Sequence, residues 1–238
     1  MTIERAGIAL EAVTFRFADM AMRFDLEVAS GAWLAVTGPS GAGKSTLLNL
    51  IAGFETPLSG RVTIDGRDMT GVPPAKRPVT TLFQEHNLFA HLSVADNVGL
   101  GIDPRLKLDN AQRAQVGAAL AQVGLRDVEK RLPAQLSGGE RQRVALARSL
   151  VRARPVLLLD EPFAALGPAQ RREMLALVGQ LRAERGFTVL MVTHQVDDAL
   201  HGPDLAAFVN DGRIIAVDAP AALFARRDLP ELGDYIGR

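Results

Sequence analysis

Residues 38–45 read Gly-Pro-Ser-Gly-Ala-Gly-Lys-Ser and match the pattern G-x-x-x-x-G-K-[ST]. The apolar run Ala32 to Thr37 before them predicts a strand buried on both faces, and the apolar stretch Ser45 to Ala52 after them predicts a helix. Glycines in this position let successive backbone N–H groups turn inward around a phosphate chain, and the helix dipole favours the same anion. A plain glycine-rich turn is the alternative, but the flanking strand and helix favour a nucleotide site.

Two polar side chains of this segment have predicted roles. Lys44 would reach the β and γ phosphates of the nucleotide, and the Ser45 hydroxyl would ligate Mg²⁺. The predicted nucleotide-binding residues of the segment are consecutive and comprise Gly38, Pro39, Ser40, Gly41, Ala42, Gly43, Lys44, Ser45 and Thr46.

A second apolar run, Val156 to Leu159, ends in the carboxylates Asp160 and Glu161. In proteins with such a phosphate loop, a carboxylate at this kind of strand end holds the Mg²⁺ that bridges the phosphates, and Asp160 suits that role. Glu161 would polarise the attacking water as a general base. Two solvated acids at a strand end are the alternative, and the intact phosphate loop favours the catalytic reading.

Gln84 and His194 each follow an apolar run, Thr80 to Phe83 and Thr188 to Thr193. The ends of buried strands are where α/β proteins place site residues. His194 could hydrogen-bond a γ-phosphate, and Gln84 could contact Mg²⁺ or water. The residues alone favour a structural or surface role for both, so these two assignments depend on further support.

The order of predicted elements indicates an α/β fold. Alternation of apolar and polar residues near the N-terminus predicts antiparallel strands, the middle of the chain is helical, and strand–helix–strand order in the last third predicts a parallel sheet. The expected strands are 8–17, 22–28, 32–37, 59–66 (closed by the turn Asp65-Gly66), 155–160, 188–193, 206–209 and 213–217, and the expected helices are 45–52, 108–126 (with Asp109 as N-cap), 137–152 and 169–185.

Composition excludes several classes of site and partner. The 238 residues include no cysteine, so disulfides and thiolate metal sites are excluded. The formal net charge is zero, which gives no indication of a nucleic-acid partner. No apolar run is long enough to span a bilayer, and no signal-peptide pattern opens the chain. We therefore expect a cytoplasmic protein, which would serve a membrane only by docking on another protein.

Residues 136–142, Leu-Ser-Gly-Gly-Glu-Arg-Gln, resemble the signature sequence of the ABC ATPases. The order of the phosphate loop, Gln84, this signature, the acidic strand end and His194 matches that family over nearly the whole chain. The resemblance implies a P-loop NTPase with a RecA-like core, an N-terminal antiparallel β subdomain and an α-helical subdomain. It further implies one domain over 1–238, with core and β subdomain at 1–86 and 153–238 and the helical subdomain at about 87–152.

The same resemblance implies a homodimer that sandwiches two ATP molecules head to tail. Ser137, Gly138 and Gly139 of one subunit would face the phosphate loop of the other, presenting a second helix N-terminus to the γ-phosphate. Phe17 lies where the family places an aromatic residue that stacks on adenine, although a core-facing strand residue is the alternative.

Three further segments are similar to the ATPase subunits of thiamine importers: 73–78, 83–89 and 96–101. This narrower resemblance implies a subunit on the cytoplasmic face of the inner membrane that energises thiamine uptake. Its partners would be a transmembrane permease, docked near the residues after Gln84, and indirectly a periplasmic thiamine-binding protein. The alternatives are import of another small nutrient such as iron, molybdate or polyamine, a soluble ABC ATPase of DNA repair or translation, and a subunit that hydrolyses ATP poorly.

Two residues depart from the family pattern. Glu140 replaces the usual glutamine of the signature, at an expected helix start. Gly167 replaces an aspartate that in the family helps to bridge the two subunits. Because Gly167 precedes Pro168 and a predicted helix, we expect it to be an N-cap, where glycine costs only a few tenths of a kcal/mol relative to aspartate. The fold should therefore tolerate the change, whereas coupling between the two sites is in question.

Overall fold

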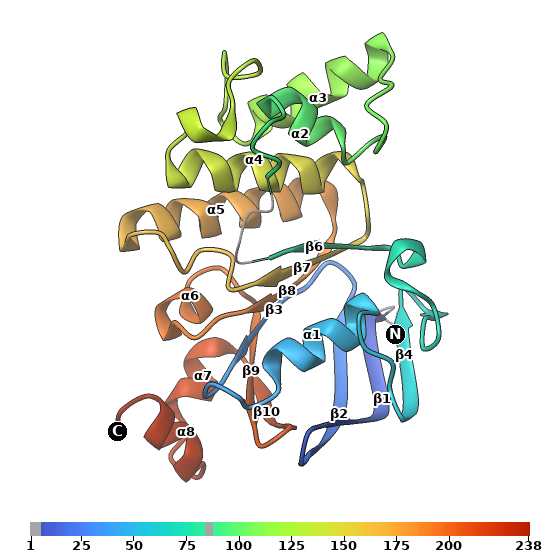
Figure 1. The fold of residues 1–238 in the computed structure, drawn as a ribbon. Helices are drawn as coiled ribbons and strands as arrows, with labels where there is room; N and C mark the ends of the chain where they lie inside the picture. The colour runs from blue at the N-terminus through green and yellow to red at the C-terminus, as the bar shows by residue number, and fades with distance from the viewer. Residues whose placement is uncertain (1–5, 84–87) are drawn as a thin grey trace.

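The computed structural model describes residues 6–83 and 88–238, and within them all strands belong to one sheet (Figure 1). In spatial order the strands are β5 (Arg67–Asp68), β4 (Ser59–Ile64), β1 (Ala6–Phe17), β2 (Met20–Ala29), β10 (Arg213–Asp218), β9 (Leu205–Asn210), β3 (Trp33–Thr37), β8 (Thr188–Val192), β7 (Val156–Asp160) and β6 (Val79–Leu82).

The sheet has an antiparallel part and a parallel part. Strands β5, β4, β1 and β2 pair antiparallel, whereas β9, β3, β8, β7 and β6 are parallel neighbours. The two parts meet where β10, antiparallel to β9, lies parallel to β2 through the single pair Arg213–Arg23. There the backbone N–H of Arg23 also donates to the carbonyl of Gly212 at 2.9 Å. The hairpin β9–β10 therefore joins the N-terminal strands to the parallel sheet.

Helices cover both faces of the parallel strands (Figure 1). Helix α1 lies on one face, and α5 lies on the other with α4, α2 and α3 stacked beyond it. The α-helices are α1 (Lys44–Ala52), α2 (Val94–Gly99), α3 (Asn110–Gln122), α4 (Gly138–Val151), α5 (Pro168–Arg185), α6 (Val196–Leu200), α7 (Pro220–Ala225) and α8 (Pro230–Tyr235), and two 3₁₀ turns span Pro74–Lys76 and Pro133–Gln135. Among the described helices none is long and apolar enough to cross a bilayer.

The parallel strands are buried on both faces. In β7, Leu157 and Leu159 pack with residues of α4 and α5, whereas Val156 and Leu158 pack with residues of α1. This alternation explains the continuous apolar runs in the sequence, since every side chain of such a strand faces a core.

The carboxyl end of α1 is held by the buried side chain of Arg77. Its guanidinium donates to the carbonyls of Leu50 at 2.6 Å and Ile51 at 2.8 Å, which belong to the last turn of α1, and to Val72 O at 2.7 Å. Burial lowers the pKa of Arg77 from its usual value. A cation at the negative end of the helix dipole is stabilising, and this contact fixes the helix whose other end is the phosphate loop.

The predicted elements are found with shifts at their ends. Helix α3 has the predicted N-cap Asp109, whose side chain accepts from Gln112 N at 2.8 Å, but it ends at Gln122 rather than at Arg126. Gly124, with φ of 73°, explains that end, because left-handed backbone terminates a helix. Helices α2, α6, α7 and α8 are not among the predicted elements, because each has at most six residues and is too short to show helical periodicity.

Candidate nucleotide site

The segment between β3 and α1 forms a tight loop that only its glycines permit. Gly38 has φ of 145°, and a Cβ atom there would lie 2.0 Å from the carbonyl oxygen of Val209 on β9. Gly43 is the N-cap of α1 with φ of 102°. The loop therefore presses against the sheet, and its backbone conformation is available to glycine but not to larger residues.

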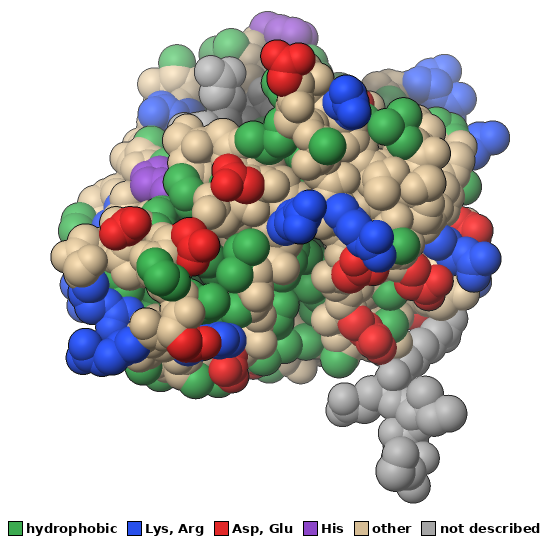
Figure 2. Space-filling view, turned by 90° about the horizontal axis from the view of Figure 1, so that it is seen from below, with side chains coloured by type: hydrophobic (Ala, Val, Ile, Leu, Met, Phe, Trp, Pro, Cys, Tyr) green, Lys and Arg blue, Asp and Glu red, His purple; other side chains and the backbone are tan. Residues whose placement is uncertain are grey.

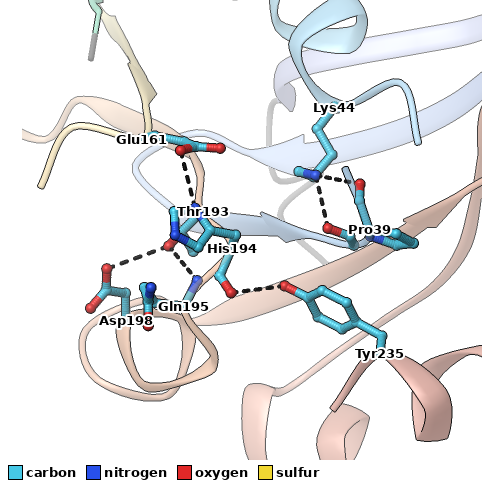
Figure 3. Close-up of polar contacts among 9 residues, drawn as sticks. Pro39, Lys44, Glu161, Thr193, His194, Gln195, Asp198 and Tyr235 are labelled. Carbon is cyan, nitrogen blue, oxygen red and sulfur yellow. Dashed lines mark hydrogen bonds and ion pairs between the residues drawn. The ribbon is translucent and has the colours of Figure 1, made fainter. Parts of the chain in front are cut away.

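Lys44, the first residue of α1, folds back over this loop. Its Nζ donates to the carbonyls of Gly38 at 2.8 Å and Pro39 at 2.7 Å (Figure 3). The residue is only 7% exposed. Burial lowers the pKa of Lys44, and the negative charges of Glu161 and Asp160 oppose that shift. The ammonium group is thus held by carbonyl oxygens between the loop and the acidic strand end.

A cavity of about 590 Å³ opens beside the loop and contains most of the predicted site residues. It is lined by Phe17, Met22, Ser40, Gly41, Gly43, Lys44, Ser45, Thr46, Asn49, Glu55, Glu161 and His194. Phe17, at the end of β1, is 63% exposed rather than packed in the core, so the core-facing alternative is wrong. Gly38, Pro39 and Ala42 belong to the loop but do not line the cavity, and neither does Asp160.

The two carboxylates after β7 lie in different environments. Asp160 is the last residue of the strand, and burial raises its pKa. The negative charge of Glu161 raises this pKa further, whereas the positive charge of Lys44 lowers it. Glu161 has φ of 44°, in the left-handed region, which costs about 1–3 kcal/mol for a residue other than glycine. Its N–H donates to Val192 O at 3.0 Å, so pairing with the neighbouring strand holds this backbone in place. The bend turns the Glu161 side chain into the cavity.

His194 and Glu161 line the same cavity and contact each other through their side chains. Its Nδ1 donates to Oε2 of Glu161 at 3.0 Å, and its backbone carbonyl accepts from the hydroxyl of Tyr235 at 3.0 Å (Figure 3). Tyr235 belongs to α8, and its ring packs against Phe208 of β9 with centroids 5.7 Å apart. Burial raises the pKa of Tyr235, so its hydroxyl stays protonated and can donate.

A second contact holds the residue before His194. The Thr193 hydroxyl donates to Oδ2 of Asp198 at 3.4 Å, and Oδ1 of the same carboxylate pairs with Nε of Arg171 on α5 at 3.5 Å. Asp198 is buried, which raises its pKa, while Arg171 and Thr193 act in the opposite direction. The backbone carrying His194 is thus connected to α8 and α5.

The signature residues lie at the N-terminus of α4, outside this cavity. Ser137 is the N-cap and is exposed; its hydroxyl accepts from Glu140 N at 3.2 Å while Glu140 accepts from Ser137 N at 2.8 Å. The Ser137 backbone hydrogen bond lowers the pKa of Glu140. Glutamate at this position therefore completes a capping box. Gln142, one turn further along, donates to the carbonyl of Pro162 and ties α4 to the loop after Glu161.

Gly167 is the N-cap of α5, as the sequence predicts. Its φ of −67° and ψ of 160° are extended, and no side-chain hydrogen bond caps the helix. A Cβ built on Gly167 meets nothing within 4 Å, so a larger side chain has room there. Gln84 lies outside the described residues, so its predicted contact with Mg²⁺ or water remains a prediction.

The protein-family model described as "ABC transporter" matches residues 21–164. The chain belongs to the ABC transporter family. Its similarity to members of this family extends well beyond the matched segment, because two curated relatives align over nearly the whole chain. The thiamine import ATP-binding protein ThiQ of Brucella suis is 56% identical over 98% of the chain and 96% of its own length, and that of Rhizobium meliloti is 54% identical over 97% of both.

Solved structures of ABC ATPases share the fold. A subunit of the ABC transporter complex cbiONQ from Clostridium perfringens has a TM-score of 0.85 and 27% identity, covering 99% of this chain and all of its own. A dimeric ATP-binding cassette in a post-hydrolysis state, bound to ADP and Pi, has a TM-score of 0.77 and 28% identity, covering 90% of this chain and 98% of its own. The fold is therefore that of an ABC ATPase subunit, an α/β P-loop NTPase.

Several residues of the site could not be found from sequence. Asn49 and Glu55 line the cavity without belonging to any motif. Asp198 accepts from the Thr193 hydroxyl five residues before it, and Tyr235 donates to the His194 carbonyl from 41 residues further along the chain. Tyr235 is the single tyrosine of the chain, but this alone does not indicate a role in the site.

Proposed function

We propose that this chain is the ATP-hydrolysing subunit of an ABC importer that takes up thiamine. The near full-length identity of 56% to a thiamine import ATP-binding protein carries this proposal. The cavity beside the phosphate loop supports it, since Lys44, Glu161 and His194 all line that cavity.

The phosphate loop would bind the triphosphate of ATP with backbone N–H groups and with the Lys44 ammonium. Lys44 Nζ now donates to two loop carbonyls, so it would exchange these acceptors for phosphate oxygens. Hydrogen bonds between an ammonium and phosphate are about twice as strong as neutral ones, which favours the exchange. Exposed Phe17 also lines this cavity and would offer an aromatic face to adenine.

Mg²⁺ would be held by Ser45 and Asp160 together with the phosphates. Among the described residues, no group of three or more His, Asp or Glu side chains could hold a metal by itself. The ion usually binds one or two carboxylates plus substrate phosphates, and this sparse donor set fits that habit. When bound, Mg²⁺ would neutralise charge on the phosphates.

Glu161 would accept the proton of the attacking water. The water oxygen bonds to the γ-phosphorus as the bond from that phosphorus to the β–γ bridging oxygen breaks, and ADP leaves. His194 holds the Glu161 carboxylate through Nδ1, which positions the base. The second ring nitrogen of His194 is left to contact the γ-phosphate.

Two copies of the chain would form the working unit. The N-terminus of α4, with exposed Ser137 and half-buried Gly138 and Gly139, does not line the cavity of its own chain, and a homodimer would place it against the partner's phosphate loop. A similar cassette is dimeric with ADP and Pi bound. We assign 87–152 as the helical subdomain and the rest of 1–238 as core and β subdomain.

A permease would dock beside the residues after Phe83. Three large apolar side chains are exposed: Phe89 at 49%, shortly after this segment in sequence, Phe54 at 53%, and Leu58 at 72%, four residues after Phe54. Phe54 also packs against Phe83 with ring centroids 5.8 Å apart. Exposed aromatic groups of this kind are typical of protein interfaces. The chain would then be peripheral on the cytoplasmic face of the inner membrane, with a periplasmic thiamine-binding protein delivering substrate to the permease.

Nucleic acid is not expected as a partner. On the face seen in Figure 2, acidic and basic side chains are scattered among one another. The formal net charge of the whole chain is zero. Binding to phosphate backbones depends on concentrated positive charge, which neither observation provides.

The deciding experiment is ATP hydrolysis by the chain co-purified with its permease and reconstituted in vesicles. Thiamine-loaded binding protein should stimulate hydrolysis, whereas the same protein without thiamine should not. Glu161→Gln should keep ATP binding, suppress hydrolysis and accumulate an ATP-bound dimer in size-exclusion chromatography. Stimulation by an iron, molybdate or polyamine system instead would reassign the substrate, and hydrolysis by Glu161→Gln at the wild-type rate would remove Glu161 as the base.

A further inference from the structure

A second cavity, of about 510 Å³, lies at the other end of the parallel strands. It is formed by the last turns of α4 and α5 and by the first residues of β6 and β7. The residues assigned to ATP hydrolysis follow the carboxyl ends of β7 and β8, so the two cavities do not overlap. The volume lies within the range of about 300–1,000 Å³ that is usual for small-molecule sites.

Most of the cavity wall is apolar. The lining side chains of this kind are Leu150, Ala153, Pro155, Val156, Leu157 and Phe187. Such a wall favours a ligand with an apolar body, because burying apolar area contributes about 25 cal/mol per Å².

Two arginines also line the cavity, and within residues 6–83 and 88–238 neither has a carboxylate partner. Neither Arg154 nor Arg185 forms an ion pair with a described residue. Arg185 Nη1 donates to Leu150 O at 2.9 Å and Nη2 to the side-chain oxygen of Gln122, which fixes its guanidinium against α4. The fixed orientation lowers the entropy cost of binding an anion.

Further arginines lie close enough to Arg154 and to one another for their positive charges to repel. Burial lowers the pKa of Arg152, and the charge of Arg154 acts in the same direction. Burial likewise lowers the pKa of Arg148, with Arg152 adding to the shift. A negative group bound near Arg154 would relieve this repulsion between like charges.

A buried hydroxyl in the same wall has no hydrogen-bond partner in the described part of the chain. Thr80 is 7% exposed, and its Oγ1 makes no hydrogen bond to any described residue. It shares a face of β6 with Leu82, which packs into the core on the α4 side, so the Thr80 side chain points toward the helices that enclose the cavity. An unpaired buried hydroxyl costs about 1–3 kcal/mol, and a polar ligand atom could satisfy it.

We propose that this cavity is a binding site for a small amphipathic anion, with an apolar body and one carboxylate. The body would lie against Leu157 and Phe187, and the carboxylate would bind the Arg154 and Arg185 guanidinium groups. The site is separate from the nucleotide cavity, so anion and nucleotide bind at the same time.

The test uses two probes of equal shape, 2-naphthoate and its neutral analogue 2-naphthamide, titrated into the full chain by calorimetry. The carboxylate should bind roughly tenfold tighter than the amide, which is the scale of one charge-assisted hydrogen bond. Arg154→Gln should reduce that preference to about twofold or less. Arg113→Gln, an exposed arginine on α3, is the matched control and should leave the preference unchanged.

Amide chemical shifts would locate the probe and separate this site from the nucleotide site. Naphthoate should perturb amides around Pro155 and Phe187, and saturating MgADP should not weaken its binding. Equal affinity for the two probes, no binding at millimolar concentration, an unchanged preference in Arg154→Gln, or competition with MgADP would each overturn the proposal.

Discussion

Replacing Gly167 by aspartate should give α5 the side-chain cap that it lacks. The backbone at Gly167 already has the extended conformation of an N-cap, and a Cβ there meets nothing within 4 Å. Aspartate is better than glycine at an N-cap by a few tenths of a kcal/mol. An exposed carboxylate at a helix N-terminus adds about 0.3 kcal/mol from the dipole at the low end of its range. We expect about 0.5 kcal/mol in the free energy of unfolding, or roughly 1–2 °C in melting temperature for a chain of this size.

Two matched variants separate the contribution of the side-chain cap from that of the negative charge at the helix N-terminus. Gly167→Asn adds a cap without charge, and Gly167→Ala adds a Cβ without a cap, so stability should follow the order Asp, Asn, Gly, Ala. The pKa of the introduced carboxylate should be lowered by the helix dipole. Its contribution is therefore present above the unfolded-state pKa of about 3.9 and is lost as pH falls through the folded-state pKa. Differential scanning fluorimetry at pH 7 and pH 2.5 measures the excess stability of Gly167→Asp over Gly167→Asn, and an excess that persists at pH 2.5 would refute the dipole argument.

Gly167→Asp should also change ATP hydrolysis by the closed dimer. The family's aspartate contributes polar contacts across the subunit interface, so Gly167→Asp should raise permease-stimulated ATP hydrolysis, by at most about 100-fold, the usual cost of one misplaced group. Steady-state hydrolysis in reconstituted complexes, with Gly167→Asn as control, tests this. Equal activities would mean that glycine is a neutral replacement, and a fall would mean that the interface has adapted to it.

Three further predictions follow from single side chains. Lys44→Ala should abolish tight ATP binding in calorimetry and leave the circular dichroism spectrum unchanged. Because burial lowers the pKa of Lys44, the ATP affinity of the wild type should fall at a lower pH than it would with an ordinary lysine. An affinity that does not change with pH would contradict this. Tyr235→Phe removes the hydrogen bond to the His194 carbonyl but keeps the ring, so kcat should fall while KM stays constant; a change in KM alone would contradict a positioning role. Thr80→Val removes, at constant shape, a hydroxyl that has no partner among the described residues, and should raise the free energy of unfolding by about 1 kcal/mol in urea titrations; a loss of stability would show that the hydroxyl is satisfied.

The phosphate loop was predictable because its information is local. The glycines, Lys44 and the flanking apolar runs lie within twenty residues of one another, and each has a fixed geometric role. The same holds for the caps at Asp109 and Ser137, where the partner lies three residues further along. Such features follow from propensity and spacing alone.

Other parts of the architecture depend on contacts that no window of sequence contains. The antiparallel strands join the parallel sheet through one pair, Arg213 with Arg23, nearly the whole chain apart. No local sequence pattern predicts the left-handed φ of Glu161, because glutamate rarely adopts it and the pairing with Val192, 31 residues further along, helps to hold it there.

One chain of contacts decides how the activity effect at Gly167 should be interpreted. The Gly167 carbonyl accepts from the N–H of Arg171 at 3.0 Å, the Arg171 side chain pairs with Asp198, and Asp198 accepts from Thr193, directly before His194. A new cap on α5 could therefore alter hydrolysis inside one chain, without any contact across the dimer. Combining Gly167→Asp with Arg171→Gln separates the two routes. If the effect runs through Arg171, the two substitutions are not additive in hydrolysis, because they act on one network. If it runs across the interface, the gain from Gly167→Asp persists in the Arg171→Gln background, and the dimer contact is the cause.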